Sequence, residues 1–111
     1  MERHAILSSL IKFDAPFADL TAALATLSWD AEPVVTLTRQ DIAAVLERFA
    51  RRDIGADALE EWANLMECRE DIGFEAGHED VVAAAIHDLA NPELSGPLVV
   101  TAPKVLSSLS P

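Results

Sequence analysis

The stretch TRQDIAAVLERFARRDIGADALEEWANLME, residues 38–67, decides the fold because its apolar residues recur twice in succession with the period of an α-helix. In each half they fall at positions i, i+3, i+4 and i+7, which places them on one side of a helix. The two sets are Ile42, Val45, Leu46 and Phe49, and Leu59, Trp62, Ala63 and Met66. Thr38 and Asp41 match a capping box at the start, and Gly55 interrupts the pattern between the sets. The stretch therefore predicts two amphipathic helices joined by a short turn.

The residues before this stretch predict two more helices and one extended segment. The first helix would bury two apolar pairs, Ile6 with Leu7 and Leu10 with Ile11. Asp14 is placed to cap a second helix that has Pro16 in its first turn. The sequence SWDAEP then breaks the pattern, because the residue before a proline avoids the helical region. Trp29 in this break is expected either to fill a hinge or to anchor a partner.

The residues after the stretch predict a loop and two further helices. Gly73 and Gly77 bracket the expected loop. The next helix runs from about Glu79 to Ala90 and stops at the Asn-Pro pair of residues 91–92. Its inward residues are Val82, Ile86 and Leu89. The connector PELSGP leads to a final short helix that we expect Thr101 to cap, with Pro103 near its start.

Taken together, these patterns predict an all-α fold. We expect one single-domain helical bundle over residues 1–111, with about five or six short helices and one short extended segment near residues 34–37. The length suits one domain, and a composition rich in Ala and Leu but poor in aromatic residues favours helix over sheet. No apolar run approaches the ~20 residues of a membrane-spanning helix, so no membrane association is expected.

Acidic residues are concentrated in one part of the chain. The formal net charge is −11. Residues 53–93 contain twelve acidic residues and one basic residue, Arg69, so this segment carries the whole net charge. Such a field repels nucleic-acid phosphates and anionic membranes and attracts cationic partners. Binding to DNA or RNA is therefore the first function to exclude.

The N-terminal residues and the cysteine content indicate a cytoplasmic location. The segment MERHAILSSLIKFDAP lacks the basic start and unbroken apolar core of a secretory signal. Cys68 is the single cysteine, so it cannot form a disulfide within the chain, which suits a reducing compartment. Cys68 also lies among carboxylates, which favour the thiol over the reactive thiolate, and a structural role is expected for it.

One cluster in residues 67–78 has the residue types of a metal site. Its members are Glu67, Glu70, Asp71, Glu75 and His78, and EAGH at 75–78 matches the Glu-x-x-His spacing of di-iron bundles. However, there is no second Glu-x-x-His, and Gly77 lies inside this one. Phosphate-binding and dinucleotide-binding glycine motifs are also absent from the sequence. We therefore expect no cofactor, no metal and no enzymatic activity.

The helix predicted over residues 56–67 also has a polar side. Asp57, Glu60, Asn64, Glu67 and Asp71 recur opposite its apolar side. A surface that is only solvated usually mixes both signs of charge, whereas this segment has almost no basic residues. We therefore predict that Asp57, Glu60, Glu67, Glu70 and Asp71 contact a basic partner, with solubility alone as the competing explanation.

Residues 36–98 resemble a group of short, acidic, uncharacterised bacterial proteins. The segments that carry the resemblance are EEWANLMECREDIG at 60–73 and LANPELSGPL at 89–98. The resemblance implies a helix that runs into a loop, but no activity. The size, helical pattern and acidic surface are also similar to those of colicin D type immunity proteins, which neutralise basic nuclease toxins. That second likeness rests on class and charge and not on matching residues.

The sequence leaves three hypotheses about function. The first is a non-enzymatic binding protein, such as an immunity or inhibitor protein, whose acidic face neutralises a basic toxin. The second is a self-associating helical module, for example a homodimer, since the chain has a high apolar content for an acidic protein. The third is a small metal-dependent enzyme that uses the carboxylate and histidine cluster of residues 67–78.

Overall fold

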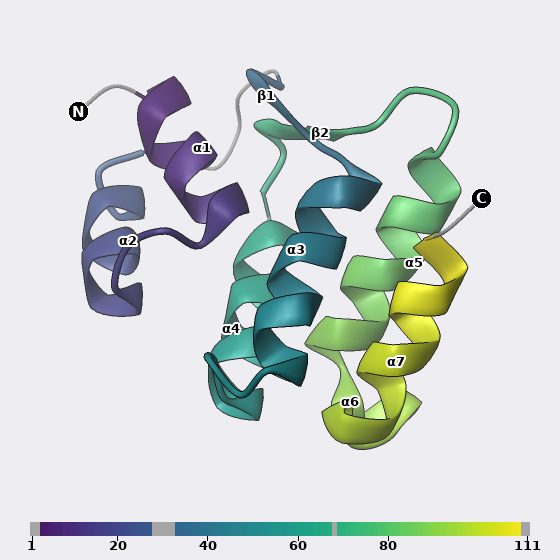
Figure 1. Ribbon diagram of the computed structural model, residues 1–111. Coiled ribbons are helices and arrows are strands. Elements are labelled where there is room, and N and C mark those ends of the chain that lie inside the picture. Colours follow the sequence, from purple (N-terminus) through teal and green to yellow (C-terminus); the bar gives the residue numbers. More distant parts are fainter. Residues whose placement is uncertain (1–2, 28–32, 68, 110–111) are drawn as a thin grey trace.

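The computed structural model describes residues 3–27, 33–67 and 69–109, and this part of the chain forms seven helices, six of which contribute to one apolar core (Figure 1). The helices are α1 (Arg3–Lys12), α2 (Phe17–Leu24), α3 (Arg39–Ala50), α4 (Ala56–Glu67), α5 (Glu79–Ala90), α6 (Pro92–Ser95) and α7 (Leu98–Leu109). The two strands are β1 (Val35–Leu37) and β2 (Ile72–Phe74). The protein is therefore mostly helical, as expected, but the described residues form seven helices instead of about five or six. The extended segment expected near residues 34–37 is β1, and its pairing with β2 makes a small sheet that an all-α fold does not include.

Four helices form the body of the molecule. In sequence order α3, α4, α5 and α7 each pack against the next, and α7 returns to pack against α3 (Figure 1). The apolar residues predicted on α3 and α4 are buried as expected, except that Phe49 is only partly buried. The helix α5 has the predicted bounds and buries the predicted side. Within the described residues, none of the helices is long and apolar enough to cross a membrane.

Trp62 is one of the residues that connect the end of α1 to this body, against which α1 also packs through α3 and β1. The indole is fully buried, and its Nε1–H donates to the carbonyl of Leu10 at 2.7 Å. Its ring lies parallel to that of Phe13, with centroids 6.5 Å apart. Arg48 also lies over the Phe13 ring, with its guanidinium carbon 5.6 Å from the ring centroid, and donates to the carbonyl oxygens of Lys12 and Phe13. Arg48 therefore accommodates carbonyl groups at the end of α1 that have no partner within that helix. Its positive charge also interacts favourably with the negative C-terminal end of the α3 helix dipole.

The strands β1 and β2 pair in parallel, with Val35 opposite Ile72 and Leu37 opposite Phe74. Parallel strands need a crossover connection, which α3 and α4 supply here. The residues that we expected to form a loop between Gly73 and Gly77 thus begin inside a strand. A Cβ on Gly73 would lie 3.3 Å from Cβ of Pro33, so the close approach of the two segments suits glycine at this position.

Two predicted helix starts are wrong. Pro16, not Asp14, precedes α2, and no side chain caps that helix. Thr101 lies inside α7, where its hydroxyl donates to the carbonyls of Ser95 and Gly96. By contrast, the Thr38 and Asp41 capping box of α3 is confirmed by both of its hydrogen bonds, at 3.0 and 3.1 Å. The predictions for Trp29 and Cys68 lie outside the described residues.

Candidate functional site

The outward side of α4 carries four carboxylates, which we call the acidic stripe. They are Asp57, Glu60, Glu61 and Glu67. Three of them are exposed and Glu60 is half-buried, while the opposite side of the helix is buried in the core. The α4 helix contains no basic residue, so like charges face each other at helical spacing along it. The stripe thus places several negative charges on the outward side of α4.

Within the described residues, only one member of the acidic stripe has an ion-pairing partner. Glu67 contacts His87 of α5, with 2.9 Å between Oε2 and Nδ1. No Lys, Arg or His side chain in that part of the chain lies within 4.0 Å of the carboxylates of Asp57, Glu60 or Glu61. Glu70, which follows α4, is exposed and has no such partner there either.

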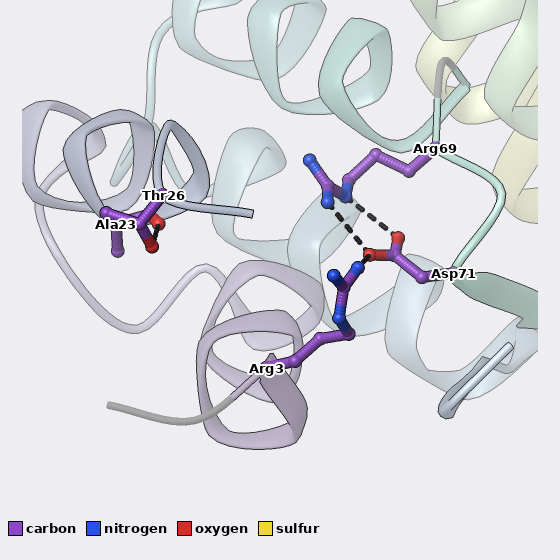
Figure 2. A network of polar contacts seen from close by, with 5 residues as sticks. All are labelled: Arg3, Ala23, Thr26, Arg69 and Asp71. Carbon is purple, nitrogen blue, oxygen red and sulfur yellow. Dashed lines mark hydrogen bonds and ion pairs between the residues drawn. The ribbon is translucent and has the colours of Figure 1, made fainter. Parts of the chain in front are cut away.

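Asp71 does not belong to this surface, which corrects its predicted place on the polar side of α4. Its side chain is 0% exposed and lies between two arginines (Figure 2). The guanidinium of Arg69 donates to both carboxylate oxygens at 2.8 Å, and Arg3 of α1 donates to Oδ2. The backbone carbonyl of Asp71 accepts from the N–H of Val34 at 3.0 Å. Asp71, the residue before β2, therefore connects α1 through Arg3 and the residue before β1 through Val34.

Two opposing effects set the pKa of Asp71. Burial raises the pKa, because it disfavours the charged form of a carboxyl. Hydrogen bonds from Arg69 and Arg3, together with their charges, outweigh this effect and hold the pKa below its ordinary value. The carboxylate is therefore ionised at neutral pH and bound within the protein.

Glu75 is also paired inside the fold. The backbone N–H of Arg39 donates to its Oε1 at 2.9 Å, and the guanidinium of Arg39 contacts both carboxylate oxygens. The backbone bond first and the guanidinium second lower the pKa of Glu75. This pair connects the residue after β2 to the first residue of α3.

The cluster predicted as a metal site is thus divided between different roles. Asp71 and Glu75 face arginines, Glu67 faces a histidine, and His78 precedes α5. Among the described residues, which exclude Cys68, no three metal-binding side chains are placed to hold one ion. The geometry favours structural pairing over metal coordination for Asp71 and Glu75.

The arginines show where the protein neutralises its carboxylates. Arg3 and Arg69 contact Asp71, Arg39 contacts Glu75, and Arg51 contacts Asp53 at 3.4 Å. None of these cations is directed at α4. Asp71, Glu75 and Asp53 are therefore matched by arginine, whereas three members of the acidic stripe are left to solvent or to a partner.

Comparison with known proteins gives no match: no family model, no curated protein and no solved structure is similar to this chain. The likeness to short acidic bacterial proteins and to immunity proteins therefore stays a prediction.

Glu61 was missed as a member of the surface although its position relative to Asp57 gave the signal. The two residues are separated by four positions, so they lie on the same side of a helix. The sequence contains only a weak indication that Asp71 is buried, namely the basic residue Arg69 two positions before it. Sequence spacing alone could not reveal Arg3, because 68 positions separate it from Asp71.

Proposed function

We propose that this protein is a non-enzymatic binding protein whose acidic stripe docks a basic protein. The observation that carries the proposal is that Asp57, Glu60 and Glu61 have no cationic neighbour in the described part of the chain, although the protein places arginines against other carboxylates. Unneutralised like charges destabilise a fold, and a cationic partner would remove that cost on binding.

The concrete form that we favour is an inhibitor or immunity protein for a basic toxin such as a nuclease. Its carboxylates would occupy the positions that substrate phosphates take on the toxin, so that the substrate is excluded sterically and electrostatically. Charge complementarity of this kind speeds association and loses strength as salt is added. The size and negative charge of the chain support this form, and the exposed α4 surface supplies a place for it.

The test is a comparison of capture by the wild type and by a charge-reversed stripe. We would immobilise the wild type and a Glu60→Lys, Glu61→Lys, Glu67→Lys variant, and pass a native cell lysate over each at about 50 and about 500 mM salt. Asp71 is left unchanged, because a lysine there would break the buried ion pair. The expected result is a basic protein that only the wild type retains, and only at low salt.

A matched control separates a local effect from the effect of net charge. Reversal of Asp19, Glu47 and Glu93 changes the net charge by the same amount at exposed positions outside α4. This control is expected to capture the same basic protein as the wild type. Equal loss in both variants would show that overall charge, and not the acidic stripe, is responsible, and it would count against the proposal.

Self-association is the second candidate, and a different observation favours it. Leu94 is 77% exposed, and Val99 and Val100 are 69% and 49% exposed, all within α6 and the start of α7. Large apolar side chains gathered at the surface are typical of an interaction site. Light scattering over a range of protein concentrations tests this candidate: a dimer that Val99→Asp dissociates supports it, and a monomer throughout rejects it.

A further inference from the structure

A groove of about 510 Å³ lies between the end of α3, the start of α4 and α7. Phe49, Ile54, Val99 and Leu106 contribute to its apolar lining. Arg52 is the one charged residue among the described residues that line it. Sites for small molecules typically have volumes of ~300–1,000 Å³ and an apolar lining with a few well-placed polar groups. No residue of the acidic stripe lines the groove, so it is separate from the proposed protein-binding surface.

The backbone at Arg52 has an unusual conformation for an arginine. After α3 the N–H of Asp53 donates to the carbonyl of Arg48 at 2.8 Å, and the N–H of Arg52 donates to that of Phe49 at 3.0 Å. These two bonds form a Schellman motif, whose turning residue is usually glycine. Arg52 occupies that position with φ +66°, which costs a non-glycine residue roughly 1 kcal/mol. A strained residue beside a groove points to a role for its side chain.

The charge of Arg52 is also left available. Its neighbour Arg51 is paired with Asp53, whereas no carboxylate in the described part of the chain lies within 4.0 Å of the Arg52 guanidinium. Arg52 is exposed at the groove of a chain whose net charge is −11. An isolated guanidinium beside an apolar lining complements a ligand that has a carboxylate at one end and a hydrocarbon at the other, since guanidinium pairs with carboxylate through two parallel hydrogen bonds.

We propose that this groove binds a small amphiphile with a hydrocarbon chain and a carboxylate head, such as a medium-chain fatty acid. The chain lies along the apolar lining, where its transfer from water is favourable. The carboxylate lies beside Arg52. Because the groove is distinct from α4, the proposal does not depend on the proposed basic partner.

Calorimetric titration with three ligands of the same chain length tests the specificity. Decanoate is expected to bind the wild type with one site per chain. Decyltrimethylammonium, which carries the opposite charge, and uncharged decanol are expected to bind at least about tenfold more weakly, since neither can form the two parallel hydrogen bonds of a carboxylate with a guanidinium. The acidic net charge alone predicts the reverse order for the two ions. Equal or tighter binding of the cation would overturn the proposal, and so would an absence of decanoate binding.

Substitutions of two neighbouring arginines test the role of Arg52 in binding the carboxylate. Arg52→Gly is expected to weaken decanoate binding by about tenfold or more, while its melting temperature stays equal or rises, because glycine suits a positive φ. Arg51→Ala removes the same charge one position away, at a residue that does not line the groove, and is expected to bind decanoate like the wild type. Unchanged affinity in Arg52→Gly would overturn the proposal. A concentration-dependent dimer that Val99→Asp abolishes, together with no decanoate binding, would instead assign the groove to a second copy of the chain.

Discussion

At the scale of single residues, Asp71 contributes most clearly to stability, because its carboxylate neutralises a buried cation. The Arg69 side chain is 2% exposed, and Asp71 accepts two of its hydrogen bonds. Asp71→Asn keeps the shape but removes the carboxylate charge that accepts these two hydrogen bonds. Breaking one partner of a buried ion pair typically costs ~3–5 kcal/mol, so we expect a loss of at least about 3 kcal/mol in the free energy of unfolding. Urea denaturation at pH 7 measures it.

Glu70→Gln provides the control for this prediction. Glu70 is adjacent and exposed, and the same chemical change there is expected to alter the free energy of unfolding by less than about 0.5 kcal/mol. Equal effects of the two substitutions would show that the pairing of Asp71 contributes nothing beyond surface charge.

The stabilisation by Asp71 also predicts a pH dependence with a definite sign. Because its pKa is lower in the folded protein than in the unfolded chain, where an Asp titrates near about 3.9, the unfolded state takes up the proton first as pH falls. The contribution is therefore complete above that range and is lost as pH falls through the lowered folded pKa. Denaturation from pH 7 to pH 2.5 should show the difference between wild type and Asp71→Asn constant near neutrality and shrinking below about pH 4. A difference that grows in acid would contradict the assigned direction of the shift.

At the scale of elements, the capping box of α3 makes a local contribution that can be isolated. The hydroxyl of Thr38 accepts from the N–H of Asp41 at 3.1 Å, and Thr38→Ala removes this bond at the start of the helix. The expected loss is about 1 kcal/mol in the free energy of unfolding, measured by urea denaturation. Thr21→Ala is the matched control, since its hydroxyl bonds within α2 and alanine favours helix there, so little or no loss is expected. A similar loss in both variants would refute the capping argument.

The elements that the sequence predicted well are those specified by local periodicity. The inward sides of α3, α4 and α5 follow from residues within each helix, such as Leu59 and Ile86, and the structure confirms them. The pairing of β1 with β2 was not predictable in this way, because Val35 and Ile72 pair although α3 and α4 lie between them in the sequence. The same reasoning applies to the candidate site. The exposed side of α4 was visible as a pattern, whereas Asp71 is buried by contacts from α1 that are distant in sequence.

At the scale of the whole molecule, some carboxylates form ion pairs that stabilise the fold, and others lie exposed and give the surface its negative charge. Arginines are directed at Asp71 and Glu75, which connect distant segments, while Asp57, Glu60 and Glu61 of the acidic stripe have no cationic neighbour in the described part of the chain. The net charge of −11 therefore acts mainly between exposed groups. Interactions between exposed charges are screened by salt far more than those of buried pairs. Added salt should thus weaken the repulsion between exposed carboxylates without disrupting the buried ion pair of Arg69 and Asp71.

The resulting prediction concerns the melting temperature. Raising sodium chloride from about 20 to about 300 mM shortens the range of surface repulsion, so the melting temperature of the wild type is expected to rise by a few degrees. In a Glu60→Lys, Glu61→Lys, Glu67→Lys variant the repulsion along α4 is largely removed, and the rise should be smaller. Reversal of Asp19, Glu47 and Glu93 is the control: if it reduces the salt effect equally, net charge and not the stripe causes the repulsion. A melting temperature that falls with salt in the wild type would mean that ion pairs outweigh repulsion, and that α4 carries no stored electrostatic cost for a basic partner to relieve.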